Sequence, residues 1–260
     1  MWPDSDDGSA MFHGLPFGLG LKASLPDHRD WNFSTIAPTD IALPPKVSYR
    51  DKFDWRWNQQ NTNSCTAFST LAAVKYTLRK DTNLDFDPSQ LFTYWCTRVM
   101  ENDPNRDEGA EIRDTFKTLG VNGVAPAKDW PFHNFTVLKR PSPVAFIDAK
   151  KELLQGYYAV NQDHVSLKTC LASGYPFVTG IIVFPSLVHS VNGIVPMPGS
   201  NEKPLGGHAV CCIGYDDEKM CYEFLNSWGV EWGDQGCFWL PYAFVENEQY
   251  TSDFWMVKAK

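Results

Sequence analysis

Three residues of this sequence have types and settings that suit nucleophilic catalysis: Cys65, His208 and Asn226. Cys65 stands in the first turn of a predicted helix, where unpaired backbone N–H groups and the positive end of the helix dipole favour a thiolate. A thiolate nucleophile needs an imidazole to hold and return its proton, and the imidazole needs a partner that orients its ring. His208 begins an apolar strand and Asn226 ends the next one, so these two residues can fill the two remaining roles.

Each of these residues also has a plainer interpretation. A cysteine in a helix rich in Ala and Leu is commonly a small core residue. The Trp- and Gly-rich stretch after Asn226 is equally typical of a β-turn. A metal pair of His208 and Cys211 fails on geometry, because residues three apart in a strand point to opposite faces. No metal or cofactor site is predicted, and we expect surface or structural roles for the other histidines, which are His13, His28, His133, His164 and His189.

Apolar spacing and capping signals predict four helices in the first two thirds of the chain. The clearest helix follows Ser64, because Ala67, Phe68 and Leu71 fall on one stripe and cations occupy its last turn. The other three are expected from Asp87, as N-cap with Pro88 at the first helical position, from about Ala110 to Leu119 with a stop at Gly120, and from about Asp163 to Ser173 with a stop at Gly174.

After Gly174 the sequence changes to short β-branched and aromatic runs, which predict strands. Because helices come first and strands later, we expect an α+β chain with a helical lobe and a β lobe, not an alternating parallel fold. The expected strands cover residues 177–184, 208–215, 220–226, 237–240 and 254–257.

Composition excludes several classes of protein. The net charge of −8 over 260 residues argues against a nucleic-acid-binding surface. No stretch of 18 apolar residues is present, so we expect no membrane span. The seven cysteines are odd in number and contain no C-x-x-C, so neither a disulfide framework nor a zinc ribbon is indicated. The N-terminus lacks the basic start and apolar core of a secretory signal, which favours a reducing, cytoplasmic compartment.

Three motifs together resemble the papain family of cysteine proteases. Gln59 precedes Cys65 by six residues in NQQNTNSCTAFS, His208 lies in GGHAVCCIGYD, and Asn226 opens NSWGVEWGDQGCFWLPYAF. The order Gln, Cys, His, Asn is that of the family, and the intervals of 143 and 161 residues from Cys65 to His208 and Asn226 are close to its spacing. Further likeness to the compact, xylellain-like members of bacteria, archaea and large viruses lies at residues 25–34, 43–52, 109–123, 130–132, 170–178 and 195–210.

The resemblance implies a two-lobed papain-like fold of the α+β class, with the active-site cleft between the lobes. The helical left lobe would span about residues 43–150, and an antiparallel, β-barrel-like right lobe about residues 151–260. Residues 1–42, which show no sustained period, would form an N-terminal extension. We expect this extension to pack over the fold or to lie in the cleft as a pro-segment, giving a zymogen-like precursor.

The resemblance also implies a role for each site residue. Cys65 would attack the scissile carbonyl, His208 would shuttle the proton and Asn226 would orient His208. Gln59 would stabilise the oxyanion together with the backbone N–H of Cys65. Gly109 would bind the substrate backbone, while the walls of the cleft would be lined by Ala110, Ala209 and Trp228.

Four positions around Cys65 depart from the family pattern. Asn63 replaces a small residue two positions before the cysteine, and its side chain is expected to narrow the site for the substrate residue just before the cut. Thr62 replaces a cysteine, which removes a familiar disulfide of the family and agrees with a reducing compartment. The other two departures are Gln60 and Thr66.

The function expected from the resemblance is that of a cysteine endopeptidase acting on protein or peptide substrates as a monomer. One alternative is another acyl-transfer use of the same Cys–His pair, such as amide or isopeptide hydrolysis or amine incorporation. A second alternative is a catalytically silent binding protein, which the substitutions flanking Cys65 make conceivable.

Overall fold

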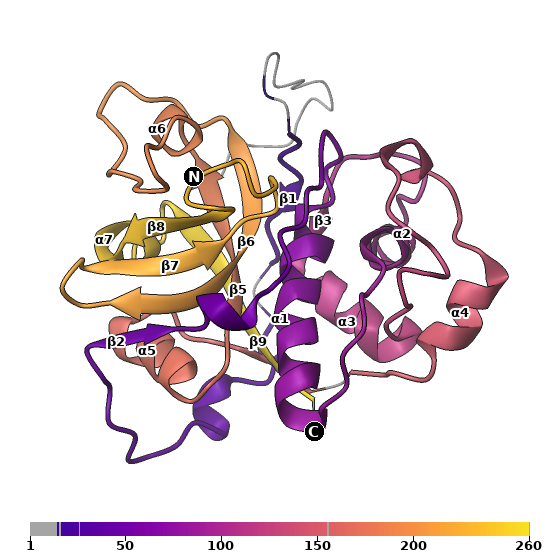
Figure 1. Cartoon of the computed structure of the whole chain (residues 1–260), viewed down its shortest axis with the longest axis horizontal. Coiled ribbons are helices and arrows are strands. Elements are labelled where there is room, and N and C mark those ends of the chain that lie inside the picture. Colours follow the sequence, from indigo (N-terminus) through magenta and orange to yellow (C-terminus); the bar gives the residue numbers. More distant parts are fainter. Residues whose placement is uncertain (1–14, 16, 26, 155, 260) are drawn as a thin grey trace.

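Helix α1 (Cys65–Thr82) runs between a β-sheet and a group of helices in the computed structural model, which describes residues 15, 17–25, 27–154 and 156–259 (Figure 1). Every residue from Cys65 to Leu78 is buried. The residues of the predicted apolar stripe are therefore buried as expected, but the opposite face of the helix is buried as well. A helix enclosed on all sides tolerates polar side chains only where they are small or paired, and its threonines and Ser69 meet that condition.

The predicted helices all form, and the ends of two of them differ from the prediction. The second helix begins with Ser89 as its N-cap, not Asp87, because the Ser89 hydroxyl accepts from the N–H of Phe92. Pro88 lies before the helix, in a bridge to Pro126. The helices besides α1 are α2 (Gln90–Met100), α3 (Ile112–Asn122), α4 (Pro143–Ala149), α5 (His164–Ala172), α6 (Pro185–Val188) and α7 (Tyr242–Val245), with single 3-10 turns at Phe33–Thr35, Arg50–Lys52 and Asn134–Thr136.

Helix α3 also differs from expectation at both ends. Gly120 lies inside the helix, which instead ends at Gly123, whose φ of 83° is the left-handed conformation that glycine adopts without strain. Ala110 and Glu111 precede the helix as the short strand β3. Helix α5 follows the prediction, with Asp163 as its N-cap and Gly174 just beyond its end.

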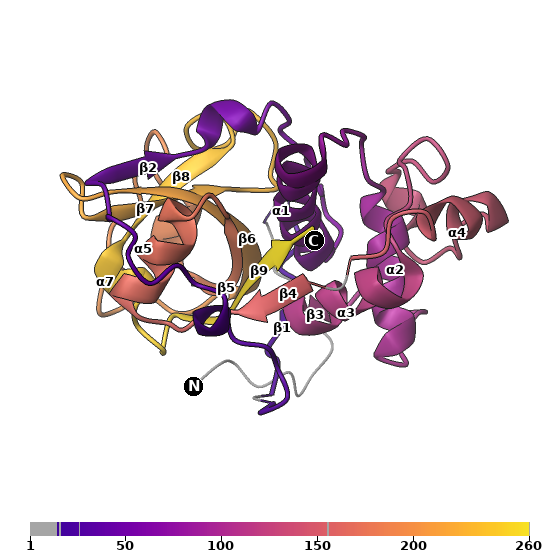
Figure 2. The same ribbon diagram turned by 90° about the horizontal axis from the view of Figure 1, so that it is seen from below.

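The β lobe is one sheet of seven antiparallel strands in the order β4, β9, β5, β6, β7, β8, with β2 added to β6. All five strands predicted after Gly174 are confirmed. The sheet curves strongly but does not close into a barrel within the described residues (Figure 2). Its strands are β2 (Lys46–Ser48), β4 (Gly156–Ala159), β5 (Phe177–Val183), β6 (Gly206–Asp216), β7 (Cys221–Leu225), β8 (Cys237–Pro241) and β9 (Thr251–Lys258).

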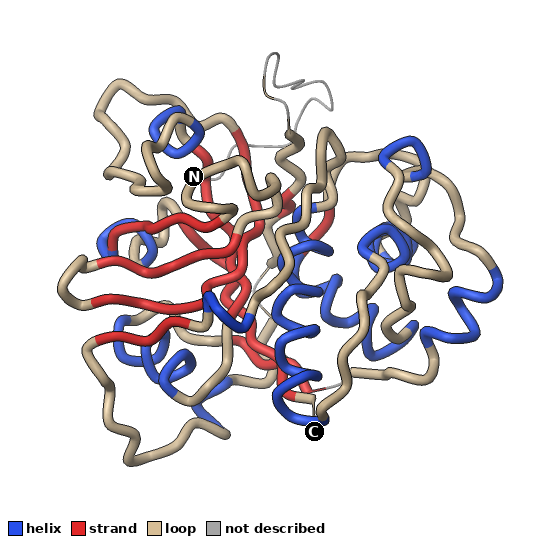
Figure 3. The backbone as a smooth tube through the Cα atoms, viewed as in Figure 1, coloured by secondary structure: helices blue, strands red, loops and turns tan. Residues whose placement is uncertain are grey.

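Helices α2, α3 and α4 lie on one side of α1, and the sheet with α5, α6 and α7 lies on the other, which confirms the α+β class (Figure 3). On the sheet side, one core cluster is built from β5, β6, β7, β8 and α5, and a second joins α1 to α3 and to β9. The division of the chain at residue 42 and near residue 150 stays a prediction, and β2, which comes before α1, belongs to the sheet of the β lobe.

The described part of residues 1–42 is attached to both sides of the molecule. Strand β1 (Leu21–Lys22) pairs in parallel with β3 (Ala110–Glu111). Phe33 is 3% exposed within the core of the β lobe, and Arg113 of α3 bonds to Asp30 at 2.7 Å. The part of this segment around Asp30 and Phe33 is therefore packed into the fold.

Replacement of Phe33 tests that conclusion. We expect Phe33→Ala to lower the free energy of unfolding by about 3–5 kcal/mol, because it removes a buried aromatic side chain and leaves a cavity. Denaturant unfolding of the full chain measures the change. Phe135→Ala is the matched control, since Phe135 is 72% exposed and its loss is expected to change stability by about 0.5 kcal/mol or less. Equal effects of the two substitutions would contradict this packing.

Candidate active site

Cys65 is the first residue of α1, as the sequence predicts. Its side chain is fully buried where the N-terminus of α1 meets β6. Backbone N–H groups of Ala209, Gly20 and Thr66 lie close enough to the thiol to lower its pKa. One of these three donors belongs to β6 and another to the N-terminal segment, so the thiol lies where three parts of the chain meet.

His208 and Asn226 come together across the β6–β7 pair. The Nε2–H of His208 donates to Oδ1 of Asn226 at 2.8 Å, which leaves Nδ1 as the nitrogen with a free lone pair. Within the described residues, Nδ1 is buried and has no hydrogen-bond partner. The ring of Trp228 stacks on the imidazole with centroids 4.7 Å apart and shields the hydrogen bond from water. The tautomer thus leaves a nitrogen free to accept a proton.

Gln59 is held in one orientation from both ends of its side-chain amide. The Ser227 hydroxyl donates to Oε1 at 2.6 Å, while Nε2 donates to the carbonyl of Thr62 at 2.7 Å and to that of Gly18 at 3.2 Å. The backbone N–H of Gln59 donates to the Ser227 carbonyl at 2.8 Å. The amide N–H of Gln59 therefore points at a carbonyl oxygen of the segment that crosses the site.

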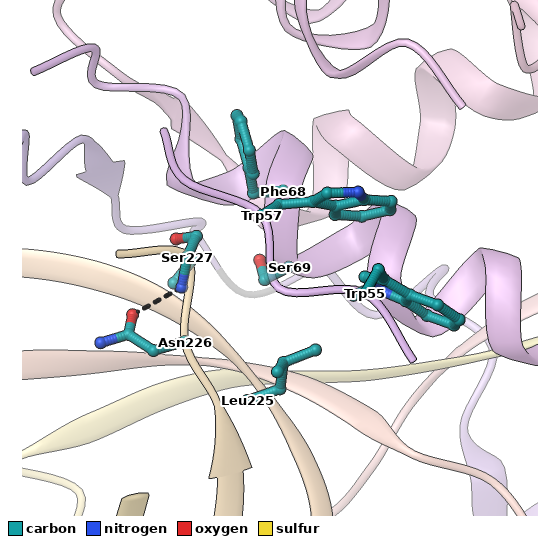
Figure 4. Close-up of a pocket in the computed structure, with 9 residues that line it drawn as sticks. Trp55, Trp57, Phe68, Ser69, Leu225, Asn226 and Ser227 are labelled. Atoms are coloured by element: carbon teal, nitrogen blue, oxygen red, sulfur yellow. Dashed lines mark hydrogen bonds between the residues drawn. The ribbon is translucent and has the colours of Figure 1, made fainter. Parts of the chain in front are cut away.

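Figure 4 shows the residues that line a small cavity between Asn226 and α1. Asn226 and Ser227 follow β7, and Oδ1 of Asn226 also accepts from the N–H of Ser227 at 2.8 Å. The space between these residues and α1 is a cavity of about 10 Å³, close to the volume that one water needs. It is lined by Trp55, Trp57, Phe68, Ser69, Ala72, Ala209, Leu225, Asn226 and Ser227.

The N-terminal segment occupies the cleft over these residues. Phe17 stacks on the outer face of Trp228 with centroids 3.7 Å apart. The N–H of Gly18 donates to the Gln60 carbonyl at 3.2 Å, and the Gly20 carbonyl accepts from the N–H of Ala110 at 2.9 Å. The segment continues as β1, and Lys22 reaches Glu101 at 3.3 Å. Backbone hydrogen bonds thus bind this stretch along the cleft.

Closure of the cleft sets the protonation of the site. Burial raises the pKa of the Cys65 thiol to about 11, although the three nearby N–H groups lower it. Burial lowers the pKa of the His208 imidazole to about 4, against the opposing effect of the hydrogen bond to Asn226. Both groups are neutral at pH 7, so the thiolate expected from the helix N-terminus is absent in this closed state. The cause is desolvation of both groups in the closed fold.

The residues predicted from the sequence lie around the N-terminus of α1, the β6–β7 pair and the segment at Gly18 and Gly20. Gly109 and Ala110 precede α3 beside β1, Ala209 follows His208, and Asn63 lies against the segment at Gly18 and Gly20. Sequence reasoning missed four contributors: Phe17, Gly18, Ser227 and Asp107. Ser227 falls inside the recognised Asn-Ser-Trp-Gly motif and was the one that could have been found.

Other site types find no support in the described residues. No group of three or more potential metal ligands occurs there, and no described helix is long and apolar enough to cross a membrane. All seven cysteines lie in the described part of the chain as free thiols, so the missing cysteine at Thr62 is not replaced by another pairing.

A scan against family models matches residues 43–252 to "Papain family cysteine protease". The chain belongs to this family. The match covers most of the chain and includes the segments that carry Gln59, Cys65, His208 and Asn226. Membership of the papain family makes the protein a cysteine peptidase, which is a hydrolase.

Individual relatives agree with the family assignment. An uncharacterized peptidase C1-like protein of Acanthamoeba polyphaga mimivirus is 34% identical over 230 residues, which is 84% of this chain and 72% of that protein. A viral cathepsin of Cydia pomonella granulosis virus is 27% identical over 234 residues, or 85% and 66% of the two chains. The crystal structure of xylellain, a cysteine protease from Xylella fastidiosa, superposes with a TM-score of 0.89 at 36% identity, covering 94% of this chain and 97% of that one. The papain-like fold predicted from the motifs is therefore confirmed.

Burial of the imidazole makes a prediction about acid stability. Between pH 6.5 and 4 the unfolded chain binds a proton at His208 that the closed fold does not, so this residue lowers the free energy of unfolding as the pH falls. One such proton contributes at most about 1.4 kcal/mol per pH unit. His208→Gln should flatten the curve over this window when urea unfolding is followed at several pH values.

Buried carboxylates in the cleft raise the free energy of unfolding as the pH falls, which is opposite to the effect of His208. The informative quantity is therefore the difference in unfolding free energy between wild type and variant at each pH. Burial raises the pKa values of Glu101, Asp107, Glu111 and Asp253. His28→Gln, at an exposed histidine, is the control and should leave the curve unchanged. Parallel curves for wild type and His208→Gln would contradict a buried, neutral imidazole.

Proposed function

We propose that this papain-family peptidase is an endopeptidase that uses Cys65 as its nucleophile and His208 as its general base and acid. The hydrogen bond from His208 to Asn226, which frees Nδ1, is the observation that carries the proposal. Asn226 orients the ring, and Gln59 stabilises the oxyanion with the backbone N–H of Cys65. Gly109, Ala110, Ala209 and Trp228 hold the substrate along the cleft.

The reaction runs in two acyl-transfer steps. His208 takes the thiol proton, and the sulfur of Cys65 attacks the carbonyl carbon, so an S–C bond forms and the oxygen becomes an oxyanion beside Gln59. The C–N bond then breaks as His208 delivers the proton to the leaving amine, which leaves a thioester. Water deprotonated by His208 attacks the thioester, and Cys65 departs as the thiol while the acid product leaves.

We infer that residues 17–24 keep this machinery inactive, so that the chain is a zymogen until the segment leaves the cleft. The Gly18 carbonyl holds the amide of Gln59, and the backbone of Gly20 covers the thiol. Substrate can bind only to the fraction of molecules in which the cleft is open, and the rate is reduced by that fraction.

Displacement of the segment should therefore activate the full chain. Leucine at position 20 cannot be accommodated, because a Cβ on Gly20 would overlap the backbone carbonyl of Asn63 and lie 2.5 Å from its Cβ. We expect Gly20→Leu to raise the rate of hydrolysis of a mixed peptide library about 10-fold or more, the scale on which overpacking shifts an equilibrium.

Gly199→Leu is the matched control for this variant. Gly199 is exposed, its nearest contact is the flexible side chain of Glu202 at 3.5 Å, and the substitution should leave the rate unchanged. Cys65→Ala added to Gly20→Leu should abolish the gain. Equal rates for wild type and Gly20→Leu, both dependent on Cys65, would reject autoinhibition and leave the peptidase assignment in place.

The oxyanion role of Gln59 is tested in the same background. Gln59→Ala should lower kcat about 100-fold or more with little change in KM, because its N–H acts on the charge that develops in the transition state. Ser227→Ala should cause a smaller loss, since it removes only the group that fixes the amide of Gln59. Steady-state kinetics measure both, and a loss confined to KM would argue against an oxyanion role.

A reducing, cytoplasmic setting, a monomeric state and the absence of a cofactor complete the proposal. The seven free cysteines support the reducing setting, because disulfides are rare in proteins of reducing compartments.

A further inference from the structure

The wall of the cleft at Thr62 and Asn63 leaves no room for a side chain on the segment that crosses it. A Cβ on Gly18 would overlap the backbone carbonyl of Thr62 and lie 2.5 Å from Oδ1 of Asn63. A Cβ on Gly20 would overlap the carbonyl of Asn63. Both residues of the segment that face this wall are therefore glycines. Leu19, which lies between them, packs into the core of the β lobe.

Hydrogen bonds prevent the wall from yielding. The backbone N–H of Asn63 donates to both carboxylate oxygens of Asp107, at 3.1 and 3.2 Å, and its Nδ2 donates to the Asp107 carbonyl at 2.5 Å. The hydroxyl of the buried Tyr94 donates to the same carboxylate at 2.6 Å and accepts from the N–H of Gly109 at 3.0 Å. Asn63 is therefore fixed at its backbone and its side chain, and the brace ends at the residue proposed to bind substrate.

The Thr62–Asn63 wall lies next to the atoms that react in the proposed mechanism. The Gly18 carbonyl is the group that Gln59 holds, and the backbone N–H of Gly20 faces the thiol of Cys65. In a bound substrate, the scissile carbonyl would take the place of the Gly18 carbonyl. The substrate residue that bears this carbonyl would then lie against the Thr62–Asn63 wall.

From this geometry we propose that the Thr62–Asn63 wall, braced by Asp107 and Tyr94, restricts the substrate residue before the scissile bond to glycine. The substrates would then be peptides or proteins cut on the carboxyl side of glycine. The inference rests on the proposed function, because it assumes that Cys65 and Gln59 act on the carbonyl of that residue. Asn63 forms part of the wall that the substrate contacts, and Asp107 holds Asn63. Tyr94 is a positioning residue that holds Asp107.

Kinetics on matched peptides test the proposal. The enzyme is the full chain with Gly20→Leu, and the peptides differ only in the residue before the cut, which is Gly, Ala, Leu or Arg. We expect kcat/KM for glycine to exceed that for alanine about 10-fold or more, because an added methyl group must displace a braced wall. Asn63→Gly removes the Oδ1 contact and the side-chain hydrogen bond to Asp107, so the wall can move aside. It should raise the rates for alanine and leucine and leave that for glycine nearly unchanged.

A matched variant separates the brace from general damage to the fold. Tyr94→Phe keeps the ring and removes the hydroxyl that joins Asp107 to Gly109, so it should reduce the preference for glycine while circular dichroism stays that of the parent. Thr93→Ser is the control and should keep the preference, because it changes a buried residue next to Tyr94 on α2 whose hydroxyl has no hydrogen-bond partner among the described residues. Equal kcat/KM values for the four peptides would overturn the proposal and leave the peptidase assignment intact.

Binding to an inactive chain distinguishes failure of the subsite from failure of the mechanism. In Gly20→Leu with Cys65→Ser, the glycine peptide should bind about 10-fold more tightly than the alanine peptide by calorimetry. Selective binding without hydrolysis by the parent would reject the proposed function and support the glycine subsite. Equal binding of the two peptides would reject the subsite irrespective of the kinetics.

Discussion

The properties of the site depend on one interaction, which is the hydrogen bonding of Gly18, Leu19 and Gly20 along the cleft. It fills the position in front of Gln59 and covers the thiol of Cys65, while Trp228, with Phe17 stacked on it, covers His208. Burial of the two groups beneath these residues raises the pKa of the thiol and lowers the pKa of the imidazole. Once the segment leaves, water and substrate dipoles can return, and the helix N-terminus can stabilise the thiolate that the mechanism requires.

Rigid parts of the fold hold each catalytic group on a different element. Cys65 begins a helix that is buried on all sides, His208 lies in a central strand, and Asn226 directly follows the neighbouring strand. Trp228 covers the histidine and offers its other face to Phe17. Because the groups are fixed before substrate binds, the proposed activation requires only displacement of the segment and no rearrangement of the catalytic residues.

The parts of this fold that follow local rules could be predicted from the sequence. The periodic apolar residues after Cys65 predicted the central helix, the β-branched runs after Gly174 predicted the strands, and the resemblance to the papain family predicted the site from Gln59 to Asn226. Helix ends were less predictable where two signals compete. Gly120 reads as a stop, but the hydrogen-bonding pattern of α3 continues to Gly123, where the chain turns against the carbonyl of Ala149.

The path of the N-terminal segment could be foreseen only as a choice between packing over the fold and lying in the cleft. Its glycines, which look like markers of a flexible tail, are the residues that let backbone approach backbone at Thr62 and Asn63. No periodicity encodes such a contact, because its specificity lies in backbone hydrogen bonds and in the absence of side chains. The brace from Asp107 to Asn63 was equally hidden, since it joins residues 44 positions apart.

Alkylation of Cys65 by iodoacetamide, followed residue by residue by mass spectrometry of the full chain, tests the central claim most directly. In wild type at pH 7.5 we predict that Cys65 reacts slowly, since the segment buries it, and that the half-buried Cys221 is modified first. In Gly20→Leu, Cys65 should become the fastest of the seven thiols, and His208→Gln should remove that advantage. A rate at Cys65 that is the same in wild type and Gly20→Leu would contradict the claim that the segment controls the nucleophile.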